Sequence, residues 1–248
     1  MVPRSEDWRL TVKENIRKGC RDVWNAFMVD GAMFCDGDIP LCPTTATTLP
    51  RDMVTWGEAK AIYDQCMATG DVDFHFDAFV CFFLDDWKFD GRDGIWFDYR
   101  RTEQVLRHFA GVITPDFSTS QDFPKPWKTF NTYRMRAYGY WLGRLGYQVI
   151  NNVRWGTAET YAYCFEGIPK HSVVCIGTVA SGLRLVRNRL LFEAGLREMI
   201  RVLEPHTVIV YGSANYPPLR LLHDAGVSVV QFDSATNRRF SKIGVADE

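Results

Sequence analysis

Charged and aromatic side chains follow three short apolar runs of this chain. Asp85 and Asp86 end the first run, Asp116 ends the second, and Arg154 and Trp155 end the third. Paired carboxylates transfer protons or bind a divalent metal, and a guanidinium holds phosphate or carboxylate through two parallel hydrogen bonds. An indole stacks on a sugar or a base. The pattern therefore predicts a polar site assembled from several segments.

The apolar runs are short and rich in valine and isoleucine, which is typical of buried parallel strands. They predict strands at 79–85, 111–116, 147–153, 172–178, 207–212 and 227–232. Helices are expected at 6–28, 56–69, 101–109, 126–145, 157–165, 188–204 and 217–225, with a loop at 36–52. The carboxyl ends of parallel strands meet at one edge of a sheet, so the polar residues should converge there.

This alternation predicts an α/β fold of repeated βα units with a mostly parallel sheet. Six strands, with one or two more from the N-terminal third, favour a TIM-barrel-like fold, complete or incomplete. An open doubly wound sheet is the alternative. We expect residues 1–248 to form a single domain, in which a helical and loop segment, 1–70, packs on a βα core at 79–233.

Three further residues extend the predicted site. Thr178 ends the fourth strand, and Asn131 and Arg134 share one face of the helix at 126–145 with apolar neighbours. An inward-facing arginine needs a charged partner, for which Asp116 and Asp85 are the candidates.

These observations predict a role for each residue. Asp85, Asp86 and Asp116 would act as acid, base or metal ligand. The remaining residues would bind the ligand: Arg134 and Arg154 through its anionic groups, Asn131 by orienting it, Trp155 by stacking, and Thr178 at the fourth strand end. The competing interpretation is a set of buried ion pairs that only specify the fold.

Composition narrows the possible classes. The net charge is -1, so the whole chain has no general attraction to nucleic acid or to anionic membranes. No apolar run reaches the ~20 residues that span a bilayer, and no signal-peptide core follows Met1, which predicts a cytoplasmic protein without membrane contact. The seven cysteines are scattered, without the paired spacing of a zinc site. Glycine-rich phosphate loops and a Gly-x-Ser-x-Gly elbow are absent from the sequence.

Five segments in the same order resemble a known family, the "domain of unknown function 4417" of bacteria and phages. The segments are Phe83-Leu84-Asp85-Asp86, Thr114-Pro115-Asp116-Phe117-Ser118, Asn131-Thr132-Tyr133-Arg134-Met135-Arg136 with Gly139 and Trp141, Asn152-Val153-Arg154-Trp155, and Cys164-Phe165-Glu166-Gly167-Ile168-Pro169-Lys170. The resemblance covers roughly residues 30–215. The chain departs from the family's pattern at Asn151 and Ala180. The resemblance implies carriage by phages and mobile elements, and it supplies no reaction.

Two hypotheses about function follow. The first is a hydrolase that acts on a phosphorylated or sugar-containing small molecule, with or without a divalent metal. The alternative is a non-catalytic mobile-element protein that binds a host defence factor or DNA through the arginine-rich segment at 184–201. An enzyme needs its carboxylates exposed in a cleft, whereas a scaffold seals them against arginines.

Overall fold

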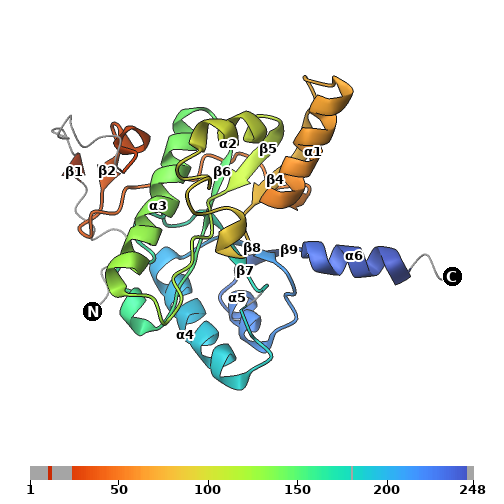
Figure 1. The fold of residues 1–248 in the computed structure, drawn as a ribbon. Coiled ribbons are helices and arrows are strands. Elements are labelled where there is room, and N and C mark those ends of the chain that lie inside the picture. The colour runs from red at the N-terminus through yellow and green to blue at the C-terminus, as the bar shows by residue number, and fades with distance from the viewer. Residues whose placement is uncertain (1–10, 13–23, 180, 245–248) are drawn as a thin grey trace.

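The computed structural model describes residues 11–12, 24–179 and 181–244. Its main sheet has seven parallel strands in chain order, and it curls into a half-barrel (Figure 1). The strands are β3 (Met53–Thr55), β4 (Phe76–Cys81), β5 (Phe109–Ile113), β6 (Val149–Asn152), β7 (Val173–Gly177), β8 (Thr207–Tyr211) and β9 (Ser228–Phe232). The predicted TIM-barrel-like, incomplete fold is confirmed. The doubly wound alternative is wrong, because the strand order never reverses.

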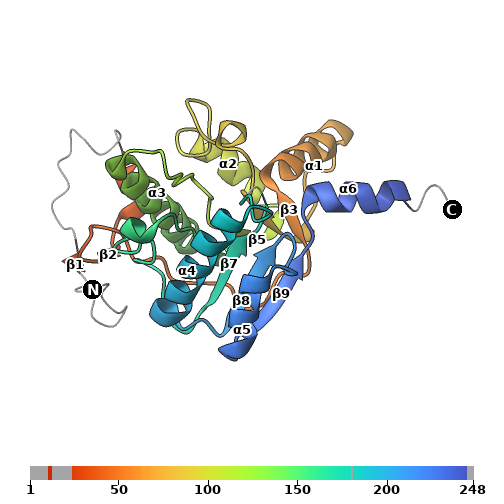
Figure 2. The same cartoon turned by 90° about the horizontal axis from the view of Figure 1, so that it is seen from below.

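Helices connect the strands and cover the convex face of the sheet (Figure 2). The α-helices are α1 (Trp56–Thr69), α2 (Tyr99–Leu106), α3 (Lys125–Arg144), α4 (Val186–Leu203), α5 (Arg220–Asp224) and α6 (Ala235–Gly244). Short 3-10 turns are η3 (Ala26–Val29), η4 (Asp86–Lys88), η5 (Ala158–Thr160) and η6 (Pro217–Leu219). The first helix begins where its sequence requires, since Thr55 and Glu58 form a capping box. Among the described helices, none is both long and apolar enough to cross a membrane.

Two predicted helices differ from the structure. Most of the helix expected at 6–28 lies outside the described residues. Its described parts are not one helix, because Thr11–Val12 is the strand β1, paired with β2 (Met33–Phe34), and η3 begins at Ala26. The helix expected at 157–165 is only η5 followed by turns. There, the N–H groups of Tyr161, Tyr163 and Glu166 each donate to the carbonyl three residues earlier. The buried Arg136 binds the backbone carbonyls of Cys164 and Glu166 at the end of this segment.

The strands alternate between two cores, as the pleat requires. On β4, Val80 packs outward beneath the helices, whereas Phe79 faces the concave interior. The interior is filled by rings that lie against glycines. A side chain at Gly111 would meet the Phe79 ring at 2.4 Å, and one at Gly177 would meet the Phe83 ring at 2.6 Å. The half-barrel therefore has a packed centre, and free space is left above the strand ends.

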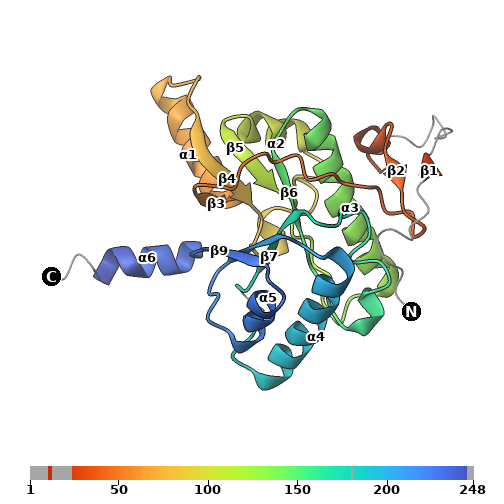
Figure 3. The ribbon, with the colours of Figure 1, turned by 180° about the vertical axis from the view of Figure 1, so that it is seen from behind.

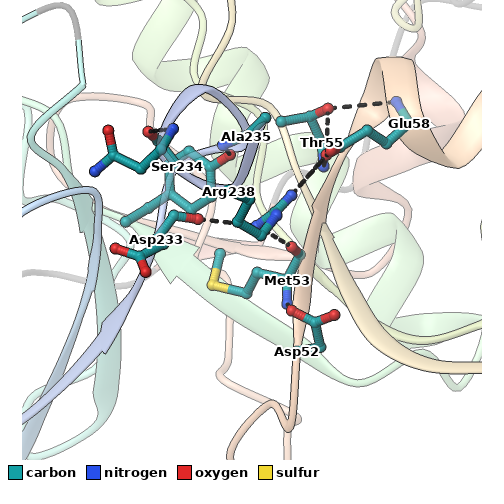
Figure 4. A network of polar contacts seen from close by, with 10 residues as sticks. Asp52, Met53, Thr55, Glu58, Asp233, Ser234, Ala235 and Arg238 are labelled. Carbon is teal, nitrogen blue, oxygen red and sulfur yellow. Dashed lines mark hydrogen bonds and ion pairs between the residues drawn. The ribbon is translucent and has the colours of Figure 1, made fainter. Parts of the chain in front are cut away.

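The edge strand β3 is completed by side chains instead of by an eighth strand (Figure 4). The Met53 N–H donates to the Asp52 carboxylate at 2.7 Å, and the Thr55 N–H donates to the Glu58 carboxylate at 2.8 Å. The Met53 carbonyl accepts from Arg238 of α6 at 2.9 Å, and Arg238 also pairs with Glu58. These three backbone groups of β3 already have partners and cannot form a ladder with β9, so the barrel stays open on this side.

Different segments of the chain lie at the N-terminal and the C-terminal edges of the sheet. The predicted loop at 36–52 runs along the N-terminal edge, where the Thr45 N–H donates to the Val149 carbonyl at 3.0 Å and Asn151 donates to the Cys42 carbonyl at 2.8 Å. The C-terminal edge carries the long loops after β4, β5 and β6 instead. Helix α6 extends away from the rest of the molecule beyond β9 (Figures 1 and 3).

Candidate functional site

A cavity of about 720 Å³ opens at the C-terminal edge of the sheet. The loops after the four successive strands β4 to β7 and the loop after β9 contribute to its wall, and β8 contributes its last residue, Tyr211. Representative residues of the loops are Asp85, Ser118, Arg154 and Val179. All strands of the sheet are parallel, so the polar residues that follow them lie at one edge, as the sequence predicts. This edge is where α/β barrels place their ligands.

An ion pair lies in the wall of this cavity. The Arg154 guanidinium donates to one Asp116 oxygen at 2.6 Å, and the Asn152 amide donates to the other at 2.8 Å. Asp116 follows β5 and Arg154 follows the neighbouring strand β6, so adjacency in the sheet brings the two together. The Arg154 side chain is 30% exposed and that of Asp116 is 12% exposed. Arg154 is therefore the more exposed member of the pair on the cavity wall.

A serine joins this pair to a second carboxylate. The Ser118 hydroxyl donates to Asp86 Oδ1 at 2.8 Å, and the Ser118 N–H donates to Asp86 Oδ2 at 3.1 Å. Arg154 Nη2 lies 3.5 Å from the Ser118 hydroxyl. Asp86 is not among the residues that line the cavity, whereas Ser118 is. The carboxylate thus stands behind the serine.

The protonation of these groups follows from their surroundings. Burial raises the pKa of Asp86, and the hydrogen bonds from Ser118 and the charge of Arg154 only partly oppose this. Burial lowers the pKa of Arg154, but the carboxylates of Asp116 and Asp86 more than offset it, so the net shift is upward. Arg154 therefore stays charged, and Asp86 accepts a proton more readily than an ordinary aspartate.

The helix α3 supports the serine from the other side. Asn131 donates to the Ser118 carbonyl at 2.5 Å and accepts from Arg134 at 2.6 Å. Arg134 faces inward, as predicted, but its predicted partners Asp116 and Asp85 are wrong. It forms two 2.8 Å hydrogen bonds with Asp90 instead, because the loop after η4 folds back over α3. Neither Asn131 nor Arg134 lines the cavity.

The other predicted site residues occupy different positions. Asp85 lines the cavity, but its side chain is 61% exposed and pairs with Lys88 at 3.0 Å. Trp155 also lines the cavity, with its ring 5.2 Å from that of Phe192 on α4. Thr178 lies at the end of β7, where its hydroxyl donates to the Ser213 carbonyl at 3.0 Å, and it does not line the cavity. Its predicted contact with a ligand stays a prediction.

Four residues of this region were not predicted from the sequence. Ser118 and Asn152 lie within the predicted segments but were not assigned a role, and their closeness to Asp116 and Arg154 was the available signal. Asp90 sits in an irregular loop without any pattern to mark it. Arg136 is fully buried and donates to the carbonyls of Asn152, Cys164 and Glu166, each at 3.1 Å, and burial lowers its pKa to about 10.

The structure also bears on metal binding and on the arginine-rich segment. Within the described residues, no three His, Cys, Asp or Glu side chains gather as metal ligands would. On α4, Arg197 pairs with Glu193 and Arg201 pairs with Glu198, both at 2.7 Å. Two of the five arginines in the segment 184–201 are thus paired with glutamates of their own helix.

Comparison with known proteins supplies a family. Residues 35–233 match the family model described as "Domain of unknown function (DUF4417)". The chain is 34% identical over 137 residues to the Gene 1 protein of Mycobacterium phage D29, covering 54% of this chain and 48% of that protein. It is 35% identical over 137 residues to the Gene 1 protein of Mycobacterium phage L5, covering 54% of this chain and 57% of that protein.

The chain thus spans about half the length of the curated relatives it matches. No solved structure matches it. The match to the family model covers most of the sequence, including all the loops that line the cavity except the one after β9. The chain belongs to the DUF4417 family and is similar to proteins of mycobacteriophages.

Proposed function

We propose that the cavity binds a phosphorylated small molecule and that the protein hydrolyses it. One observation carries this proposal: the Arg154 guanidinium is anchored by Asp116, yet it remains 30% exposed on the cavity wall beside the raised-pKa carboxyl of Asp86. A guanidinium fixed on one side presents its other N–H groups to an incoming anion in a set orientation. A carboxylate with a raised pKa is a stronger base than an ordinary aspartate and is suited to accept a proton during the reaction.

The surroundings of the pair agree with this chemistry. Trp155 contributes a partly exposed aromatic ring to the cavity, which suits the flat face of a sugar or base. Asp116 neutralises part of the Arg154 charge and fixes the direction of its guanidinium. In hydrolysis, Arg154 would hold the phosphoryl oxygens, where negative charge develops, and the Asp86 carboxylate would accept the proton of the attacking oxygen.

Binding and turnover test this proposal separately. Calorimetry with inorganic phosphate measures binding, and release of p-nitrophenol from p-nitrophenyl phosphate measures hydrolysis. We expect Arg154→Ala to weaken phosphate binding by at least tenfold, and Arg154→Lys to restore only part of it because lysine lacks the planar fork. Arg197→Ala on the surface of α4 is the matched control. Equal binding by Arg154→Ala and Arg197→Ala would refute the proposed anion site.

A second function draws on a different surface, at the start of α4. Leu185 and Val186 are 64% and 61% exposed, and Arg184 and Arg187 beside them are exposed as well. Such a patch would suit a non-catalytic role in binding DNA or a host protein. Fluorescence anisotropy with a labelled duplex tests the DNA case. Binding that falls with salt and is lost in the Arg184→Ala, Arg187→Ala double variant would favour this function. Binding that the double variant retains would exclude the patch as the DNA-binding surface.

A further inference from the structure

We infer that Ser118 is a nucleophile that forms a covalent phosphoryl ester during the reaction. This inference rests on the proposed function and deepens it, because it replaces direct attack by water with a two-step route through the protein. It is carried by the geometry around the serine, which lines the cavity while a carboxylate and a guanidinium flank its hydroxyl.

The hydroxyl is already directed toward a base. Ser118 Oγ donates to Asp86 Oδ1 at 2.8 Å, so the proton points to the group that would remove it. The same carboxylate accepts the Ser118 N–H at 3.1 Å, which fixes the carboxylate relative to the serine backbone. A nucleophile within hydrogen-bond distance of a general base is the arrangement that covalent catalysis needs.

The serine backbone is held from the opposite side. Asn131 donates to the Ser118 carbonyl, Arg134 holds Asn131, and Asp90 holds Arg134 through two hydrogen bonds. Asn131 and Arg134 lie within α3 and Asp90 lies in the loop that covers it, and none of the three lines the cavity. They are positioning residues. The chain of contacts fixes the loop that carries Ser118, which preserves the direction of its hydroxyl.

Another hydroxyl on the cavity wall offers an internal comparison. Thr55 also donates to a carboxylate, that of Glu58, at 2.9 Å. However, Thr55 is the N-cap of α1, and Glu58 is paired with Arg238. Burial raises the pKa of Glu58, but its hydrogen bonds from Thr55 and Arg238 outweigh this and the net shift is downward, whereas the pKa of Asp86 is raised. Asp86 is therefore the better proton acceptor of the two.

The proposed reaction has two steps. Ser118 Oγ attacks the phosphorus atom and forms the new O–P bond while its proton passes to Asp86. The bond from phosphorus to the leaving oxygen breaks, and that oxygen departs with the electron pair and is protonated by solvent. Arg154 stabilises the charge on the phosphoryl oxygens. After Asp86 releases its proton to solvent, it accepts one from water, whose oxygen attacks the phosphorus atom and forms a new O–P bond. The bond between Ser118 Oγ and phosphorus breaks, Oγ takes the proton from Asp86, and phosphate leaves.

Diisopropyl fluorophosphate tests the nucleophile without knowledge of the substrate. Attack by Ser118 forms an O–P bond and expels fluoride, and intact-mass and peptide mass spectrometry locate the adduct. We expect a single adduct on Ser118 that is absent from Ser118→Ala and forms at least tenfold more slowly in Asp86→Asn. Ser120→Ala, another hydroxyl on the cavity wall, should label like the unaltered protein. The labelling rate should rise with pH at values above the ordinary range of an aspartate, as a deprotonated Asp86 requires.

Each result bears on one proposal. No adduct, or an adduct on another residue of a folded protein, overturns the role of Ser118. Labelling at Ser118 without hydrolysis of p-nitrophenyl phosphate supports the nucleophile and refutes phosphate-ester hydrolysis. Hydrolysis that survives in Ser118→Ala but not in Arg154→Ala refutes the covalent route and leaves the hydrolase intact. A thermal melt of each variant confirms folding, and Asp86→Asn serves if Ser118→Ala does not fold.

Discussion

Two arginine–aspartate pairs lie on either side of the segment that carries Ser118, and they are built differently. Arg134 is 3% exposed, binds Asp90 with both ends of its guanidinium, and lies 3.9 Å from the ring centroid of Phe117. Arg154 is 30% exposed and uses one nitrogen on Asp116. Sequence patterns made both arginines candidates for ligand binding, but only the second one can reach a ligand in the cavity.

The difference shows how one kind of contact serves two purposes. A pair whose cation is sealed among aromatic rings cannot exchange its partner for water or for a ligand, so it specifies where α3 and the loop at 90 must lie. A pair at the rim of a cavity retains donors for a second anion. Burial and surroundings, not residue types, separate the two, and neither can be read from sequence spacing.

Removal of the sealed cation should have the largest effect on stability. Arg134→Ala leaves Asp90 and Asn131 without their donor in a largely buried setting, so we expect a loss of about 3–5 kcal/mol in the free energy of unfolding. Urea denaturation followed by circular dichroism measures it. The matched control is Arg197→Ala, which breaks an exposed pair with Glu193 and should cost less than about 1 kcal/mol. Equal costs would show that Arg134 is solvated.

The sequence was informative wherever periodicity reports burial. The apolar runs predicted all six strands from β4 to β9, and the helix at 56–69 has the predicted bounds because its caps are encoded locally by Thr55, Glu58 and Gly70. The edge strand β3 was expected only as one of one or two extra strands. The prediction of a helix at 157–165 was wrong, because the N–H groups of Tyr161, Tyr163 and Glu166 each donate to the carbonyl three residues earlier and form turns instead. Apolar spacing alone does not distinguish such turns from an α-helix.

Some contacts of the candidate site could be predicted from the sequence, and others could not. Adjacency in a parallel sheet brought Asp116 and Arg154 together, and that adjacency follows from the order of strands. The partner of Arg134 did not follow, because Asp90 reaches it from a loop whose course no periodicity describes. Ser118 was overlooked because a serine among predicted site residues has no special spacing. Its significance comes from the 2.8 Å contact with Asp86, which only the folded structure provides.

The buried carboxyl group of Glu166 contrasts with the buried guanidinium of Arg134, because no described side chain of opposite charge pairs with it. Glu166 is buried, and one of its carboxyl oxygens has no hydrogen-bond partner among the residues that the structure describes. Burial raises its pKa to about 7, a hydrogen bond from the Gly37 backbone opposes this, and the charges of Asp36 and Asp38 add to it. Arg136 nearby does not compensate, because it binds the backbone carbonyl of Glu166 instead of the carboxylate.

This arrangement predicts how stability depends on pH. Between the ordinary glutamate value of 4.5 and about 7, the folded protein binds more protons at Glu166 than the unfolded chain does. Stability should therefore fall as pH rises through that window, by up to about 3 kcal/mol at about 1.4 kcal/mol per unit. Glu166→Gln should flatten this slope in urea titrations at several pH values, whereas Glu193→Gln on the surface of α4 should leave it unchanged. A slope that persists in Glu166→Gln would assign it to other groups.

The smallest effect on stability is expected at the cavity pair. Asp116→Asn keeps an oxygen that accepts from Asn152, and the partly exposed Arg154 can be solvated, so we expect a loss of about 1 kcal/mol. Asp90→Asn removes the charge that faces the sealed Arg134 and should cost about 3 kcal/mol or more. The order should reverse for phosphate binding measured by calorimetry, because Asp116→Asn releases the orientation of Arg154 while Asp90→Asn leaves the cavity wall in place. If Asp116→Asn were as destabilising as Asp90→Asn and phosphate binding were unaffected, both pairs would be structural, and the cavity would lose the group proposed to hold its ligand.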